Sequence, residues 1–304
     1  MKKVLVTGAS GAIGAALLPQ LVAQGYQVHV LGRTLKTPQS SIHYFQWDVA
    51  AGIMDEKALD GVEGIIHLAG AGVADQRWTA ARKREILDSR VNSTRMLIDF
   101  LRKGNHQVRR FVCASAVGYY GDTGGDWISE THQPAKTFLA AVCEAWEAAA
   151  QEAEKLGIAA VSCRIGIVLD ATSGALPELI KTLPLGVAGY FAKSPLFYPW
   201  IHVQDIAAIF VHAVSNESMR GIYNATAPHP VSQREIVAAS RKILGSHAVM
   251  LPVPKPAVQL LVGEMADMLF CSQRCSADKL LKTGFVFRFP QLEEALSDLL
   301  KTKN

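Results

Sequence analysis

Three glycines at regular intervals near the amino terminus form the strongest candidate binding element in this sequence of 304 residues. Residues 7–14 read Thr-Gly-Ala-Ser-Gly-Ala-Ile-Gly, directly after the apolar run 4–6 and before a segment with apolar residues at helical spacing. Glycines in a turn from strand to helix let the backbone approach a pyrophosphate, whose charge faces the free N–H groups of the helix. A purely structural glycine turn is the alternative. The context predicts a dinucleotide-binding loop built from Thr7, Gly8, Ser10, Gly11, Ala12, Ile13 and Gly14.

About twenty residues further on, a dinucleotide-binding chain places the side chain that reads the ribose 2′ position. The sequence there is Gly32-Arg33-Thr34, so the acid that would hold a free 2′-OH is absent. Arg33 offers a planar, permanent cation suited to a 2′-phosphate. The alternative is an exposed loop arginine. We therefore predict NADP(H), rather than NAD(H), as the cofactor.

The periodicity of hydrophobic residues predicts the strands and helices that position these residues. Short β-branched or apolar runs predict strands, and longer segments with apolar residues at helical spacing separate them. The predicted strands are 4–6, 27–31, 44–47, 64–68, 110–114 and 159–164, and the predicted long helices are 13–24, 80–102 and 138–156. Strands that alternate with helices indicate the α/β class, with a Rossmann-type doubly wound parallel sheet.

The alternation stops near residue 170, where prolines and glycines become frequent. Shorter helices are predicted beyond it, at 205–214, 232–244, 256–269, 276–282 and 291–300. We expect an NADP-binding Rossmann domain over residues 1–170 and a smaller substrate-binding lobe over 171–304, with some segments of the latter returning to the first domain. The expected position of this lobe is the carboxyl edge of the sheet, where such folds bind ligands.

Composition excludes several classes of protein. Hydrophobic residues make up 49% of the chain and charged residues 19%, which is enough apolar material for a core. The net charge of +4, from 31 basic and 27 acidic residues, is too small and too dispersed for a nucleic-acid binder. No apolar run is long enough to span a membrane. Five scattered cysteines indicate reduced thiols rather than disulfides or a metal site. We expect a soluble, cytoplasmic protein without a metal.

The order of several short motifs resembles the extended short-chain dehydrogenase/reductase superfamily. The motifs are residues 7–14, Asp48 after the third strand, the run His-Leu-Ala-Gly-Ala at 67–71, Asn92 in the long helix and Ser115 after the fifth strand. More specific segments resemble its bacterial epimerase family protein branch, whose members are labelled sugar-nucleotide epimerase-like. These segments are 77–79, 115–121, 146–147, 200–205 and 284–296. The resemblance spans essentially the whole chain.

The resemblance implies roles for individual residues. Gly8, Gly11 and Gly14 are similar to the pyrophosphate loop, Arg33 to the 2′-phosphate contact, Asp48 to the adenine contact, and Leu68, Ala69 and Gly70 to the backbone along the cofactor. Ser115 corresponds to the hydroxyl that polarises a substrate carbonyl, and Asn92 to the amide that organises a proton relay. A loop cap for Asp48 and an exposed helix amide for Asn92 are the structural alternatives. The resemblance also implies a homodimer through two long helices.

Three positions depart from the superfamily pattern. Its acid/base is a tyrosine followed four residues later by a lysine, because an unassisted phenol with a pKa near ~10 is a poor base at neutral pH. Counting back from Glu147, Leu139 and Cys143 occupy these two positions. Nucleotide-sugar enzymes also clamp substrate phosphates with an arginine where Tyr198 stands here. Nucleotide sugars are therefore poor candidates for the substrate.

The remaining candidates for chemistry are Ser115, Tyr119 and Tyr120, which follow the fifth strand directly. Packing of both tyrosines between the lobes is the alternative. We interpret His202 as a locally bonded residue ahead of a helix capped by Asp205. The sequence thus predicts a reductase or an epimerase-like enzyme that acts on an unidentified small molecule. The competing hypothesis is an NADP(H)-dependent sensor or regulatory protein with little or no turnover.

Overall fold

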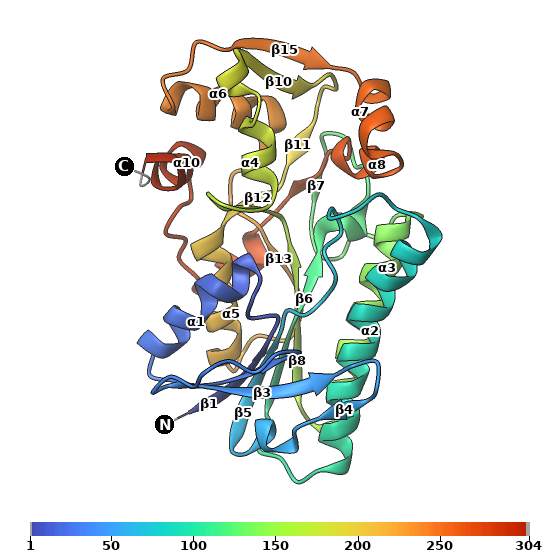
Figure 1. Ribbon diagram of the computed structural model, residues 1–304, viewed down its shortest axis with the longest axis vertical. Coiled ribbons are helices and arrows are strands. Elements are labelled where there is room, and N and C mark those ends of the chain that lie inside the picture. Colours follow the sequence, from blue (N-terminus) through green and yellow to red (C-terminus); the bar gives the residue numbers. More distant parts are fainter. Residues whose placement is uncertain (1, 302–304) are drawn as a thin grey trace.

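A large β-sheet forms the centre of the computed structural model, which describes residues 2–301 (Figure 1). In that part of the chain its strands, in spatial order, are β13 (Gly221–Ala225), β8 (Ala159–Ile165), β6 (Arg110–Ala116), β5 (Val62–His67), β1 (Lys3–Thr7), β2 (Gln27–Gly32), β3 (Ile42–Asp48) and β4 (Ile53–Met54). Neighbouring strands run parallel except β3 and β4. The order reverses at β1, and such a reversal opens a crevice beyond the carboxyl ends of the strands.

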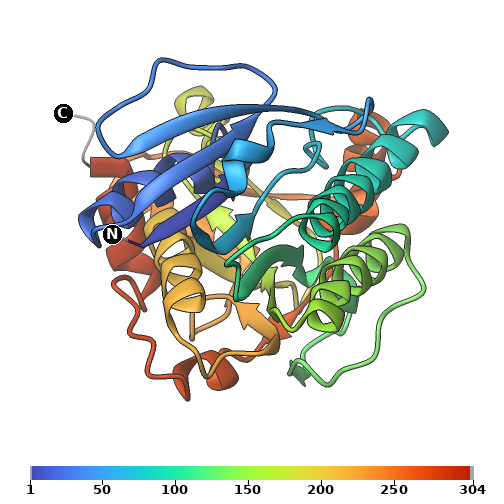
Figure 2. The ribbon, with the colours of Figure 1, turned by 90° about the horizontal axis from the view of Figure 1, so that it is seen from below.

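Helices cover both faces of the sheet, as Figure 2 shows in a view from below. Helix α1 (Ala12–Ala23) packs against α5 (Val203–Ser215) on one face, and α2 (Ala80–Lys103) packs against α3 (Phe138–Gln151) on the other. Thr79 and Thr137 cap α2 and α3 by accepting N–H groups from the first turn of each helix. The predicted α/β class, with a doubly wound parallel sheet, is confirmed.

A second lobe lies beyond the carboxyl end of β6 in Figure 1. It has a smaller apolar core of its own, which includes Leu176, Trp200 and Ile236. The elements from residue 167 onward, apart from α5 and β13, are β9 (Ile167–Leu169), α4 (Ala175–Ile180), η4 (Leu183–Leu185), β10 (Val187–Phe191), β11 (Phe197–Tyr198), β12 (Trp200–His202), β14 (Val231–Ser232), α6 (Gln233–Ile243), β15 (Val249–Val253), α7 (Lys255–Val262), α8 (Met265–Leu269), β16 (Arg274–Cys275), α9 (Asp278–Leu281) and α10 (Leu292–Lys301).

Two elements from the second half of the chain belong to the large sheet layer. Helix α5 covers the sheet beside α1, and β13 extends the sheet beyond β8. The division of the chain at residue 170 stays a prediction, with the expectation that some later segments return to the first domain. In the described range 2–301, no helix combines the length and apolarity that crossing a membrane requires.

Two local predictions in this region are wrong. The single helix predicted over 256–269 is two helices, because Gly263 between α7 and α8 has a φ of +65°, which a continuing α-helix does not allow. Asp205 does not cap α5. His202 does so, by accepting the Gln204 N–H on Nδ1 at 3.0 Å. The Asp205 carboxylate instead accepts the N–H groups of Arg288 and Phe289, at 2.8 and 2.9 Å, and so anchors the chain ahead of α10.

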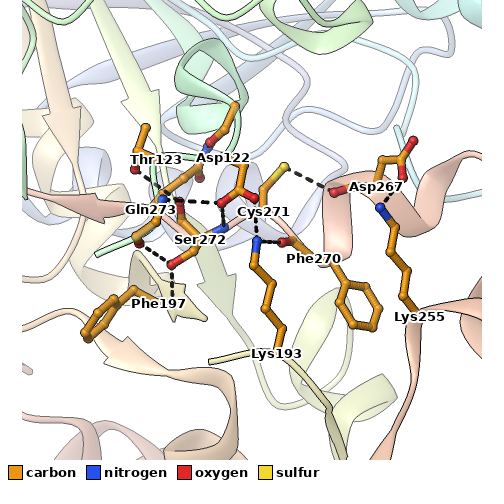
Figure 3. A network of polar contacts seen from close by, with 12 residues as sticks. Asp122, Thr123, Lys193, Phe197, Lys255, Asp267, Phe270, Cys271, Ser272 and Gln273 are labelled. Atoms are coloured by element: carbon orange, nitrogen blue, oxygen red, sulfur yellow. Dashed lines mark hydrogen bonds and ion pairs between the residues drawn. The ribbon is translucent and has the colours of Figure 1, made fainter. Parts of the chain in front are cut away.

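A polar network ties the second lobe to the loop that follows β6 (Figure 3). Asp122 accepts the N–H of Ser272 at 3.1 Å and forms an ion pair with Lys193. The buried Gln273 donates from Nε2 to the carbonyl oxygens of Val117 and Gly121, both at 2.8 Å. These contacts fix the 3-10 turn η2 (Val117–Tyr120) and hence one wall of the candidate site.

Candidate functional site

The glycine turn between β1 and α1 borders a cavity of about 860 Å³ at the carboxyl edge of the sheet. Two of its glycines are required by the fold itself. Gly8 has a φ of +69°, and a Cβ there would lie 2.7 Å from the carbonyl carbon of Leu68. A Cβ on Gly14 would lie 2.5 Å from Cα of Ala9. Both distances are too short for any side chain, so these residues allow β1, the turn and β5 to pack closely.

Gly11 is different, because nothing in the fold requires its lack of a side chain. Its φ is −78°, and the nearest atom to an added Cβ would be the carbonyl oxygen of Gly8 at 3.6 Å. It is the N-cap of α1, which has no side-chain cap and no acidic residue in its first turn. The N–H groups of a first helical turn have no partner inside the helix. The open space at Gly11 therefore fits a pyrophosphate bound to the N–H groups that follow, such as those of Ala12 and Ile13.

The other predicted residues of the loop lie at different places. Ser10 lines the large cavity with Gly8, and Ile13 lines a neighbouring, smaller one. Thr7 lines neither cavity. It is fully buried, and its hydroxyl oxygen accepts the N–H groups of Leu68 and Ala69, both at 3.2 Å. Thr7 thus joins the ends of β1 and β5 and positions the backbone of Leu68 and Ala69, which line the smaller and the large cavity.

The end of β2 brings two cations to the large cavity. Arg33 and Lys36 are exposed and line it together with Thr34. Sequence reasoning missed Lys36, which lies beyond the usual fingerprint position. Asp48 lines the same cavity, and its Oδ1 accepts the N–H groups of Ala50 and Ala51 at 2.9 and 3.1 Å. Asp48 is therefore a loop cap and also a wall of the cavity.

A buried hydrogen-bond chain holds the end of β5 in place. Because Thr7 Oγ1 already accepts two N–H groups, it donates its own proton to His67 Nδ1, at 2.7 Å. His67 Nε2 then carries the ring proton and donates it to Ser93 Oγ, at 3.1 Å. Burial, with a smaller contribution from nearby Arg90, lowers the pKa of His67 to about 3. A neutral His67 is thus part of the rigid support beneath Ala69 and Gly70, which line the large cavity.

Asn92 is not brought to the site. Its side chain is exposed, and it lines neither of the two cavities. Ser89 and Ser93, four residues apart on the inner face of α2, line the large cavity instead. Ser89 Oγ accepts the Ala71 N–H at 3.0 Å. The predicted residue, Asn92, is thus the direct neighbour of Ser93, which faces the cavity. Asn92 itself is an exposed amide on a helix, which was the structural alternative.

The smaller cavity has a volume of about 330 Å³ and lies between the end of β6, helix α3 and the chain after β8. Leu139 and Cys143, which occupy the positions of the superfamily's tyrosine and lysine, both line it. Burial raises the pKa of the Cys143 thiol to about 11, and the thiol donates to the Ala116 carbonyl at 3.5 Å. Neither side chain therefore supplies a base at neutral pH.

Ser115 lines this cavity, but its proton is already committed. The buried hydroxyl donates to Glu147 Oε1 at 2.6 Å, and Arg164 binds the same carboxylate through two bonds of 2.8 Å. Glu147 and Arg164 are largely buried, at 10% and 3% exposure of their side chains. Sequence reasoning gave neither residue a site role, although Glu147 belongs to a segment that carries the resemblance. This hydroxyl cannot donate to a substrate carbonyl while it holds Glu147.

The two tyrosines of η2, Tyr120 buried and Tyr119 half-buried, contact Arg164 and line neither cavity. Tyr120 donates to Asn224 Oδ1 at 2.6 Å and accepts from Arg164 Nη1 at 3.0 Å. Burial raises its pKa far above the usual range for a phenol. The Tyr119 ring lies against the Arg164 guanidinium, 3.3 Å from ring centroid to Cζ. The packing alternative thus describes both tyrosines in this structure.

Tyr198, where nucleotide-sugar enzymes place an arginine, is buried and donates to the Leu269 carbonyl at 2.7 Å. It is part of the core of the second lobe and offers no group to a substrate phosphate. A phosphate clamp is therefore missing at this position, as the sequence predicted.

Residues 4–226 match the family model described as the NAD dependent epimerase/dehydratase family. The chain belongs to this family. Residues 253–299 match a second model, described as a domain of unknown function, DUF1731. The matched residues include the glycine turn, the residues that line both cavities, helix α5 and strand β13. The resemblance inferred from the motifs is confirmed.

Individual relatives agree over nearly the whole chain. The epimerase family protein YfhF of Bacillus subtilis is 32% identical over 299 residues, covering 98% of this chain and 97% of its own. The human epimerase family protein SDR39U1, crystallised with NADPH, is 28% identical with a TM-score of 0.85, over 98% of this chain and 99% of that one. A UDP-N-acetylglucosamine 4-epimerase from Bacillus cereus, at 17% identity and a TM-score of 0.78 over 100% and 96% of the two chains, shares the fold.

Proposed function

We propose that this protein binds NADP(H) along the carboxyl edge of the sheet and acts on a small molecule in the smaller cavity. The observation that carries the cofactor assignment is the end of β2, where Arg33 and Lys36 line the large cavity and no acid occupies residues 32–34. Two cations at the end of β2, without an acid at residues 32–34, suit a ribose that carries a 2′-phosphate rather than a ribose with a free 2′-OH. The NADPH bound by the human relative supports the same cofactor.

Each part of the site has a role in holding the cofactor. The α1 N-terminus and the open space at Gly11 take the pyrophosphate, and Asp48 lies at the adenine end of the large cavity. The backbone of Ala69 and Gly70, supported by the Thr7 and His67 hydrogen bonds, lies along the cofactor. When bound, NADPH supplies a hydride, and the protein supplies orientation and a dry cavity.

Arg33→Ala tests the cofactor assignment. One hydrogen-bonded contact to a charged phosphate is worth about 1.5–3 kcal/mol, so the variant should bind NADPH roughly ten- to a hundredfold more weakly. Its affinity for NADH should not change. Arg95, an exposed arginine of α2 that lines neither cavity, provides the control variant Arg95→Ala. Equal dissociation constants of the unmodified protein for NADPH and NADH would refute the assignment.

We propose a reductase or epimerase-like activity that draws its proton from water or from the substrate. The hydroxyl and the thiol that line the smaller cavity are both engaged: Ser115 donates to Glu147, and Cys143 donates to Ala116. This same observation favours the second candidate function, an NADP(H)-dependent sensor with little turnover. Incubation of the protein with NADPH and a library of small carbonyl compounds distinguishes a reductase from a sensor, because a sensor oxidises no NADPH beyond the buffer control.

A further inference from the structure

The smaller cavity is lined by one side chain whose hydrogen-bond donors are only partly used by the protein. Among its lining residues, Ser115 and Cys143 donate their protons as described above, and Trp146 Nε1 donates to Thr94 Oγ1 at 3.1 Å. Most of the other lining side chains are aliphatic, with Ile13, Leu68 and Leu139 as examples. Arg90 is the exception.

Arg90 reaches the cavity from α2 and is held in a fixed orientation. Its Nη1 donates to the carbonyl oxygens of Ala71 and Ile86, at 2.9 and 3.0 Å. Its guanidinium carbon lies 5.1 Å from the centroid of the Trp146 ring. The side chain also packs under Gly70, where an added Cβ would lie 3.1 Å from Cγ and Cζ of Arg90. These hydrogen bonds, the Trp146 ring and the packing under Gly70 therefore hold the guanidinium of Arg90 in one orientation.

The other edge of the same guanidinium has no partner. Across residues 2–301, no hydrogen bond from Nε or Nη2 of Arg90 is formed, and no carboxylate forms an ion pair with it. Neither nitrogen belongs to the fully enclosed polar atoms that lack a partner, so this edge borders accessible space. Nε and Nη2 together form the fork that binds a carboxylate through two parallel hydrogen bonds.

The charge of Arg90 is uncompensated. Burial lowers the pKa of Arg90, and nearby Arg82 acts in the same direction. A half-buried cation without an anionic partner is costly, and an anion that binds to it offsets part of that cost. A preformed, unpaired cation in an otherwise apolar cavity is the arrangement expected for recognition of a small anionic ligand.

We propose that Arg90 anchors the carboxylate of the substrate, and that the substrate is a small organic acid with an otherwise apolar body. This inference rests on the proposed function for the identity of the site and adds the substrate class. The volume of about 330 Å³ is at the small end for ligand cavities, and the aliphatic lining accepts the apolar body. The missing phosphate clamp at Tyr198 agrees with a substrate that carries no nucleotide.

Binding of isobutyrate and of its neutral isostere isobutyramide tests the proposal. Both are titrated by calorimetry into the protein saturated with NADPH and into the protein alone. We expect isobutyrate to bind more tightly than isobutyramide, and Arg90→Gln to weaken isobutyrate binding roughly ten- to a hundredfold without changing the binding of isobutyramide or NADPH. Arg90→Lys, which keeps the charge but not the fork, should lose part of this affinity and provides the test if Arg90→Gln fails to fold.

Arg110→Gln is the matched control. Arg110 also binds two backbone carbonyls, at Ala213 and Met219, but it is buried and lines neither cavity. Equal affinity of the unmodified protein for the acid and the amide would overturn the proposal. It would also be overturned if Arg90→Gln weakened NADPH as much as isobutyrate, because Arg90 would then serve the cofactor. Failure of NADPH itself to bind would refute the proposed function, while the titration of the protein alone would still report on Arg90.

Discussion

Replacing Gly11 by valine should abolish cofactor binding while leaving the fold intact. The φ and ψ of Gly11, −78° and 170°, are open to any residue, and a Cβ would have 3.6 Å to its nearest neighbour. The cost to folding is the loss of a favourable N-cap residue, about 1 kcal/mol. The cost to binding is larger, since a branched side chain would fill the space over the α1 N-terminus that the pyrophosphate needs.

Thermal unfolding with and without NADPH measures both effects. At a ligand concentration of 100 times Kd, binding stabilises the unmodified protein by about 2.7 kcal/mol. An unfolding entropy near 2.1 cal/mol/K per residue amounts to about 0.64 kcal/mol/K for this chain. NADPH should therefore raise the Tm of the unmodified protein by about 4 °C, and Gly11→Val should lower the Tm of the free protein by about 1.5 °C.

The decisive result is the loss of the NADPH-induced rise in Gly11→Val. Gly14→Ala is the control for the fold, because its Cβ would lie 2.5 Å from Cα of Ala9 and must displace the backbone. That variant should lose far more stability without NADPH than Gly11→Val does. If Gly11→Val keeps the full rise in Tm, the pyrophosphate does not bind at this turn and the reasoning is wrong.

Three further predictions concern the buried polar groups around the site. Tyr120→Phe should lower the free energy of unfolding by about 1–3 kcal/mol in denaturant titration, because Asn224 loses its donor, and should leave NADPH affinity unchanged; a loss of turnover without a loss of stability would instead make Tyr120 catalytic. Glu147→Ala should cost about 3–5 kcal/mol by the same measurement, since it leaves Arg164 buried without an anion, and a change below 1 kcal/mol would contradict this. The folded-state pKa of His67, about 3, lies below its unfolded value, so the unfolded chain binds more protons between these pH values. Stability should fall by up to about 1.4 kcal/mol per pH unit as pH decreases from about 6.5 toward 3, and this slope should be shallower in His67→Gln.

The sequence alone determined the parallel sheet, the glycine turn after β1 and one of the two cations at the end of β2, Arg33. These features are local, because a strand, its glycine turn and the following helix are encoded by neighbouring residues. Arg33 was therefore found by counting along the chain, and so were Leu139 and Cys143 at the positions of the superfamily's tyrosine and lysine. The structure adds that Leu139 and Cys143 line the smaller cavity. The sequence also placed the three loop glycines in one turn, but their spacing gives all three the same role. Only the structure shows that the fold requires Gly8 and Gly14, whereas Gly11 leaves space for a ligand.

Tertiary structure decided which polar side chains remain available for chemistry. Ser115 and Tyr120 looked available in the sequence, but Glu147, Asn224 and Arg164, each distant along the chain, bind their hydroxyl groups. Arg90 shows the opposite change. In the sequence it is an ordinary helix arginine, and in the structure it lines an apolar cavity whose described lining residues include no acid. A hydrogen bond or an unpaired charge depends on which distant segments meet, and a spacing pattern within one segment does not contain that information.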